Sequence, residues 1–125
     1  MAGFTNAFAA TTLDTLFPTS AAPDYIGYST NGSSEFTIAN LPRTAIGATN
    51  WASATVADPS VKQNTAQVTS AAVTTAGGTI THFAIFSASS AGTQKTDWQA
   101  LDNSRLLAVG DSLQWAGTAC KITLT

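Results

Sequence analysis

One stretch decides the fold of this chain: Thr79-Ile80-Thr81-His82-Phe83-Ala84-Ile85-Phe86-Ser87. Successive side chains of a β-strand point to opposite faces of the sheet, so Ile80 and Phe86 share one face and Phe83 and Ile85 share the other. Large apolar groups on both faces are typical of a strand that is covered on both sides. We therefore predict that residues 79–87 form a central strand.

Short segments with β-branched and aromatic residues continue in both directions, separated by turn residues at intervals of roughly 8–12 positions. The chain also contains a break at Gly77-Gly78 and a polar insertion around residues 94–102. Gly110-Asp111 is typical of a tight hairpin. The expected strands are residues 24–29, 35–39, 41–46 (an edge strand or an irregular segment because of Pro42), 51–56, 65–70, 105–109 and 112–115, and a last strand in which Cys120, Ile122 and Leu124 face inward. The predicted class is all-β: a single antiparallel β-sandwich or a jelly-roll-like barrel with a short N-terminal helix.

The helix is expected over residues 6–17, because apolar side chains recur there at helical spacing. They are Ala9, Leu13, Leu16 and Phe17. Asn6 is the expected N-cap, and Pro18 ends the helix because it restricts the residue before it. We predict two parts of the chain, an N-terminal helix and linker over residues 1–23 and a β-sandwich domain over residues 24–125.

Charged residues are rare. The 125 residues include only five Lys and Arg and seven Asp and Glu, which give a net charge of −2. So weak a charge favours neither nucleic acid nor an anionic membrane as partner. No apolar run approaches the roughly 18 residues of a membrane span. A surface of Thr, Ser and Ala suits a protein whose faces are covered by its own copies or by a partner; the alternative is a Thr-rich β-protein that is soluble alone.

The residues that carry most enzyme chemistry are also scarce, with one histidine and one cysteine. His82 would need a nucleophile and a carboxylate beside it to act in catalysis, so we expect a hydrogen-bonded side chain near Thr79, Thr81 or Thr96. Cys120 alternates with apolar residues and is expected in the core. The acids follow no metal-binding pattern, and nothing selects a catalytic pair. We therefore predict no catalytic residue, no cofactor and no metal site.

The three tryptophans, Trp51, Trp98 and Trp115, admit two interpretations. Aromatic rings can form a platform for sugar, but in a β-sandwich they more often lie in the core or at an interface. The apolar side of the N-terminal helix must also be covered by something. The predicted interface residues are Leu13, Leu16, Phe17, Trp51 and Trp98.

Several strings in the second half resemble a family of small phage virion proteins. They are Asn64-Thr65-Ala66-Gln67-Val68-Thr69, Gly78-Thr79-Ile80-Thr81-His82-Phe83-Ala84-Ile85-Phe86, the loop from Ala88 to Gly92, Val109-Gly110-Asp111-Ser112-Leu113-Gln114-Trp115-Ala116-Gly117, and Ile122-Thr123-Leu124. The helix at residues 6–17 is similar to the opening segment of that family. The chain departs from the family pattern at Ser87, where the family often has aspartate.

The resemblance implies a virion structural protein without enzymatic activity. Our first hypothesis is a capsid decoration (cement) protein that binds the outside of the assembled head and stabilises contacts between major capsid subunits. Its expected partners are the major capsid protein and itself, as a homotrimer. The alternative is a tail-fibre or receptor-binding module, and a small hydrolase is a third hypothesis. The first residues carry no positive charge and no signal-peptide apolar stretch follows, so we expect synthesis in the host cytoplasm and a final place on the capsid surface of the virion.

Overall fold

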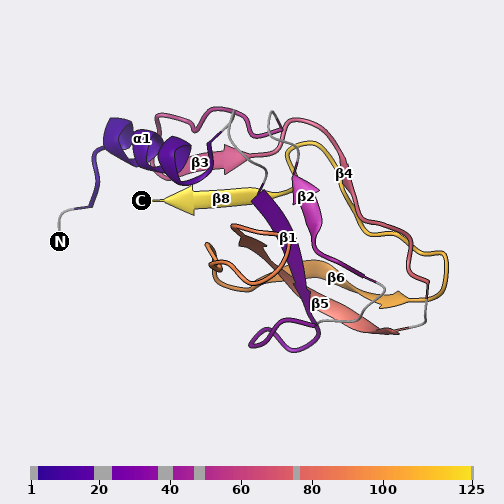
Figure 1. Ribbon diagram of the computed structural model, residues 1–125. Coiled ribbons are helices and arrows are strands. Elements are labelled where there is room, and N and C mark those ends of the chain that lie inside the picture. Colours follow the sequence, from indigo (N-terminus) through magenta and orange to yellow (C-terminus); the bar gives the residue numbers. More distant parts are fainter. Residues whose placement is uncertain (1–2, 19–23, 37–40, 47–49, 75–76, 125) are drawn as a thin grey trace. The chain divides into compact units, whose positions relative to one another are not determined.

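The computed structural model describes residues 3–18, 24–36, 41–46, 50–74 and 77–124. These residues form one helix and eight strands, shown in Figure 1. The elements are α1 (Asn6–Leu16), β1 (Asp24–Ser29), β2 (Thr44–Ile46), β3 (Ser60–Gln63), β4 (Val68–Thr69), β5 (Gly77–Phe86), β6 (Gln99–Leu107), β7 (Gln114–Trp115) and β8 (Lys121–Leu124). The predicted all-β class with a short N-terminal helix is confirmed, and the antiparallel sheet is consistent with the predicted sandwich.

The chain divides into two compact units, each built from segments that are distant in sequence. Unit 1 contains the described parts of Met1–Pro23, Ile46–Gln67 and Trp115–Thr125, and unit 2 those of Asp24–Ala45 and Val68–Gln114. The expected boundary at residue 23 lies outside the described residues, so that division of the chain stays a prediction.

Unit 2 is organised around β5, as the alternating apolar residues predict. The strand order of its sheet is β2-β1-β5-β6, and β5 pairs antiparallel with both of its neighbours. Ile85 lies opposite Ile26 on β1, and both side chains are fully buried. The strand begins two residues earlier than expected, since Gly77 and Gly78 belong to it rather than interrupting it. Glycine can adopt the extended backbone of a strand, so a pair of glycines does not by itself indicate that a strand is interrupted.

Part of the polar region expected around residues 94–102 belongs to the edge strand β6. Residues 99–107 form a nine-residue strand whose side chains are mostly exposed. A strand with water on both faces has no apolar alternation, which is why the sequence pattern missed its first part. Its register against β5 shifts twice, between Gly77 and Thr79 and between Ile80 and His82. Such irregularities make an edge strand a poor template for pairing with another chain.

The prediction that residues 105–109 and 112–115 pair as a hairpin across Gly110-Asp111 is wrong. A turn is present: Gly110 has a positive φ of 91°, and the Asp111 side chain accepts a hydrogen bond from the Ala108 N–H at 2.9 Å. However, the strand after the turn, β7, pairs with β4 rather than with residues 105–109. The turn residues therefore predict where the chain reverses, but they do not predict which strand pairs with the one after the turn.

Unit 1 contains α1, β3 and β8. The strands β3 and β8 pair antiparallel, and α1 packs against both (Figure 1). Ile122 on β8 is buried and Leu124 is half-buried, while Lys121 and Thr123 are exposed, which agrees with the predicted alternation. The sequence pattern does not predict β3, which lies between the expected strands 51–56 and 65–70 and contains Lys62, a residue type that is rarely buried.

The residues that the helix buries differ slightly from the predicted ones. Ala9, Ala10, Leu13 and Phe17 are buried, whereas Leu16 is 51% exposed. The N-cap is Thr5 rather than Asn6, since the Thr5 hydroxyl accepts the Phe8 N–H at 3.3 Å. The last helical residue is Leu16, one residue before the expected end, and Phe17 forms the C-cap ahead of Pro18.

Three further expected strands are shorter or absent in the described residues. Residues 35 and 36 are not in a strand, and the rest of the expected 35–39 strand lies outside the described residues. In the 51–56 segment only Trp51 forms a bridge, to Asn64. Residues 65–70 contain only the two-residue β4. Side-chain hydrogen bonds that compete with regular pairing explain much of this, because Asn50 and Asn64 bond directly to backbone groups of residues 65 and 66.

Candidate functional site

The histidine and cysteine occupy structural positions. The His82 Nδ1 lies 2.7 Å from the hydroxyl of Thr81, one of the three predicted neighbours. Cys120 is fully buried, and burial raises the pKa of its thiol to about 12. A thiol with that pKa is protonated at neutral pH and is therefore a weak nucleophile. Within the described ranges, no group of three His, Cys, Asp or Glu residues is placed to hold a metal ion, and no helix is long and apolar enough to cross a membrane.

Two of the three tryptophans lie in the core. Trp51 and Trp115 are buried within the chain, at 3% and 6% exposure. Trp98 is half-buried, and its ring centroid lies 5.8 Å from that of Phe86. Buried rings cannot stack on a sugar, so Trp51 and Trp115 do not form the platform that the sequence left open.

The five predicted interface residues are placed differently from one another. Leu13, Phe17 and Trp51 are buried, and the rings of Phe17 and Trp51 form an edge contact at 5.6 Å between centroids. These three stabilise unit 1 itself. Leu16 is exposed and Trp98 is half-buried. The interface role of the set stays a prediction.

Three large apolar side chains on α1 and in the segment before it are exposed, which the sequence pattern did not reveal; we refer to these three residues as the stripe. Phe4, Phe8 and Leu16 are 48%, 56% and 51% exposed, and the two phenylalanine rings contact each other edge to face. Three helix threonines donate their hydroxyls to the carbonyl four residues earlier, which satisfies these polar groups within the helix. They are Thr11, Thr12 and Thr15. The stripe therefore combines exposed apolar groups with few free hydrogen-bonding groups, which is typical of a contact surface.

An ion pair attaches α1 to the rest of unit 1. Lys62 on β3 is fully buried, and its Nζ lies 2.7 Å from the Oδ1 of Asp14 on the helix. The same oxygen accepts the Ala54 N–H at 2.8 Å. Burial opposes the ionisation of Asp14, but the hydrogen bonds from Lys62 and Ala54 and the charge of Lys62 outweigh it and lower the pKa of the carboxyl. Asp14 is therefore ionised in the folded protein at neutral pH.

We expect Asp14→Asn to lower the free energy of unfolding by about 2–3 kcal/mol at pH 7, because it leaves the Lys62 ammonium buried beside a neutral amide. The value is at the low end for a buried pair because the Asp14 side chain is 44% exposed. Lys62→Met in the Asp14→Asn background should recover part of the loss. Urea unfolding of the three proteins measures this, and a double variant no more stable than Asp14→Asn would contradict it.

The same pair predicts an acid-dependent loss of stability. Since the folded pKa of Asp14 lies below its ordinary value of 3.8, the stabilisation is complete above that value and is lost as pH falls through the folded pKa. The difference in unfolding free energy between wild type and Asp14→Asn should therefore shrink below about pH 4.

The second polar cluster lies in unit 2 and is centred on Arg43. Its guanidinium donates Nε–H and Nη2–H to the two oxygens of Glu35, at 2.6 and 2.9 Å, and Nη1–H to the carbonyls of Ala88 and Ala91, both at 2.8 Å. The Arg43 Cζ also lies 3.8 Å from the centroid of the Phe86 ring. A bidentate pair of this kind fixes both the position and the orientation of the carboxylate.

Gly27 makes room for this cluster. A Cβ at residue 27 would lie 2.4 Å from a ring carbon of Phe86 and 2.9 Å from the Glu35 Oε2. A larger residue would therefore displace the ring that stacks on Arg43 and the carboxylate that pairs with it.

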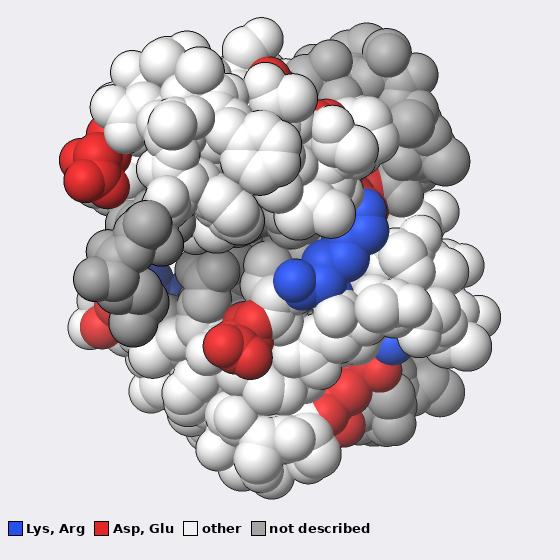
Figure 2. Space-filling view, turned by 90° about the vertical axis from the view of Figure 1, so that its left-hand side faces the viewer, with Lys and Arg blue, Asp and Glu red and all other residues white. Residues whose placement is uncertain are grey.

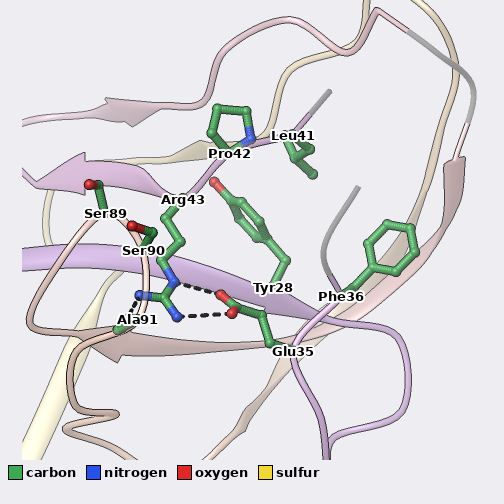
Figure 3. A pocket seen from close by; sticks show the side chains of 9 residues that line it. All are labelled: Tyr28, Glu35, Phe36, Leu41, Pro42, Arg43, Ser89, Ser90 and Ala91. Carbon is green, nitrogen blue, oxygen red and sulfur yellow. Dashed lines mark hydrogen bonds and ion pairs between the residues drawn. The ribbon is translucent and has the colours of Figure 1, made fainter. Parts of the chain in front are cut away.

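A cavity of about 190 Å³ lies beside the Arg43–Glu35 pair (Figure 3). Figure 3 shows Arg43, Ser89 and Ser90 gathered at one end and Leu41 and Phe36 at the other. Tyr28 lies between them, and its hydroxyl makes a short hydrogen bond with the Thr44 hydroxyl. Burial raises the pKa of Tyr28 to about 12, so the phenol keeps its proton at neutral pH. The cavity residues come from distant segments, and no spacing in the sequence could have grouped them.

The face of the molecule in Figure 2 is formed largely by uncharged residues. Among the described residues, three ion pairs join Arg43 with Glu35, Lys62 with Asp14 and Lys95 with Asp24. Much of the small charge inventory is thus used in contacts within the chain. This leaves a surface suited to contacts of low net charge rather than to the recognition of highly charged polymers.

Comparison with known proteins gives one family. The family model described as "Podophage GP4 fiber I protein gp80" matches residues 4–123. The searches of curated proteins and of solved structures gave no match. The match spans α1 and nearly all of the sequence after it, including, apart from Leu124, the strings on which the resemblance to phage virion proteins rests. The chain therefore belongs to the Podophage GP4 fiber I protein gp80 family, and it is a phage virion structural protein.

Proposed function

We propose that this protein is a non-enzymatic subunit of a virion fibre, which acts by making contacts with copies of itself and with neighbouring virion proteins. The observation that supports this most is the family match over residues 4–123, because its description names a fibre protein. The exposed stripe of Phe4, Phe8 and Leu16 supplies a surface for such contacts. A homotrimer is the assembly that we propose, since closed symmetry is the usual form of homo-oligomers.

Capsid decoration is the second candidate. A decoration protein would contact the major capsid protein on the outer surface of the head and stabilise the assembled shell by binding only that state. The largely uncharged face in Figure 2 supports such a contact, because a broad protein interface needs few free charges. The two candidates therefore differ in where the protein lies on the virion rather than in the kind of contact it makes.

Immunogold electron microscopy of intact virions tests the proposal. For a fibre subunit we expect gold along appendages that project from the particle. Label spread evenly over the head would favour decoration of the capsid instead. A second preparation with antibody pre-absorbed on the purified protein controls for adventitious labelling.

The stripe on α1 gives a test at the level of residues. Phe8→Ser combined with Leu16→Ser should weaken self-association by roughly tenfold or more, because each change removes exposed apolar area from the contact. The melting temperature of the subunit should stay nearly unchanged, since both side chains are about half exposed. Sedimentation velocity over a concentration series measures the association.

Val56→Ser provides the matched control, because Val56 is 68% exposed in the same unit and lies outside the helix. If the helix variant associates as strongly as this control, the stripe does not form the contact. Deletion of residues 1–17 is a less informative test, since it would also remove Leu13, Phe17 and the partner of Lys62 from unit 1.

A further inference from the structure

We propose that the cavity beside Arg43 binds one neutral sugar ring. The proposal adds a ligand to the structural role above, and it is argued from the cavity alone. The cavity measures about 190 Å³. That is smaller than the roughly 300–1,000 Å³ of sites for drug-sized ligands, so it suits a single ring-sized group.

The lining has the two-sided character that a sugar ring requires. Phe36, Leu41 and Pro42 form an apolar wall, and Arg43, Glu35, Ser89 and Ser90 supply hydrogen-bonding groups (Figure 3). A pyranose has apolar C–H faces and a rim of hydroxyl groups that both donate and accept hydrogen bonds. It can therefore pack a face on the apolar wall while its hydroxyls meet the polar end.

The charges of the lining favour a neutral ligand over an ion. The Arg43 guanidinium is already paired with both oxygens of Glu35, so the cluster carries no net charge. An anion would compete with Glu35 for Arg43, and a cation would compete with Arg43 for Glu35. Sugar hydroxyls can instead donate to the remaining lone pairs of the carboxylate without breaking the pair.

The polar end is fixed before any ligand binds. Arg43 holds the carbonyls of Ala88 and Ala91, which anchors both ends of the loop that carries Ser89 and Ser90. Ala91 has a positive φ of 51°, a conformation that a residue with a side chain adopts only at some cost. Both serines are exposed, and neither hydroxyl hydrogen-bonds to another residue in the part of the chain that the structure describes. Two hydroxyls on an anchored loop are suitable groups for hydrogen bonding to a sugar.

The test is an NMR titration of the isolated protein with methyl glycosides of glucose, galactose and mannose. We expect at least one of them to shift the amide resonances of Arg43 and of residues 89–91 in a saturable way. Ser90→Phe should weaken that response roughly tenfold or more, because the added ring occupies the cavity. Ser112→Phe is the matched control, since Ser112 is exposed in the same unit and does not line the cavity.

Three outcomes would overturn the proposal. One is the absence of any response at tens of millimolar glycoside. Another is an equal response in Ser90→Phe and Ser112→Phe, which would place binding elsewhere. The third is saturable binding of N-acetyl-leucine amide without a response to glycosides, which would assign the cavity to an apolar side chain of a protein partner. Because the titration needs no virion, its failure would leave the fibre location to be decided by immunogold labelling.

Discussion

Asn64→Leu is expected to lower the free energy of unfolding by about 2–4 kcal/mol, because it removes three hydrogen bonds at once. The Asn64 side chain is fully buried. Its Nδ2 donates to the carbonyls of Ala66 and Ala116, at 2.8 and 3.0 Å, and its Oδ1 accepts the N–H of Cys120 at 2.9 Å. Leucine has a similar size but would leave all three backbone groups without this partner.

The measurement is thermal unfolding of wild type and variant, with an expected fall in Tm of roughly 10 °C. Asn50→Ala is the matched control. The Asn50 side chain bonds to the same chain segment, accepting the Ala66 N–H at 2.7 Å, but it is only half-buried, so water can replace its contacts. If the two variants lose the same free energy of unfolding, burial of the Asn64 side chain does not explain its contribution to stability.

Gly117 supports the same junction. A Cβ at residue 117 would lie 2.8 Å from the backbone oxygen of Thr65. The absence of a side chain therefore lets the turn after β7 approach the segment that follows Asn64. This gives a physical reason for two of the strings that resemble phage virion proteins: they contain the asparagine and the glycine that hold this junction together.

Ile85→Ala should also be strongly destabilising, at roughly 2–5 kcal/mol. Ile85 is fully buried on the central strand β5 and lies opposite Ile26, which is equally buried. Truncation leaves a cavity between two strands that have little freedom to close it. Urea unfolding measures the loss, and Thr79→Ala is the control because it is an exposed position on the same strand. A loss no larger than that of Thr79→Ala would contradict the central position of β5.

The sequence predicted those helices and strands in which the period of the apolar residues matches the side chains that are buried in the structure. The expected strand over residues 79–87 corresponds to β5, which spans Gly77–Phe86, and residues 24–29 match β1 at both ends. The segment 41–46, expected to be an edge strand or irregular because of Pro42, contains the three-residue strand β2 at the edge of its sheet. The buried face of α1 was nearly right, but Ala10 is buried where Leu16 was expected, because small side chains allow the helix to approach its neighbours closely.

Elements that depend on tertiary partners were missed. Lysine is rarely buried, and Lys62 on β3 is buried because its ammonium pairs with the Asp14 carboxylate, 48 residues earlier in sequence. The exposed β6 has no apolar period to detect. The cavity is lined by Tyr28, residues 35–36, residues 41–43 and residues 89–91, which are brought together by the sheet and by the Arg43 hydrogen bonds rather than by any local pattern. Of the two interpretations of the tryptophans, burial applies to Trp51 and Trp115, because large aromatic rings stabilise the core.

The central claim, that this chain is a structural subunit of the virion, is tested most directly by its copy number in purified particles. Quantitative mass spectrometry of gradient-purified virions, calibrated with labelled peptides of this chain and of the major capsid protein, gives that number. The account predicts a fixed number per particle that survives washing in high salt: about a dozen or a few dozen copies for a fibre, and hundreds for a decoration protein. A chain that is absent from purified virions and found only in the lysate of infected cells would contradict the account.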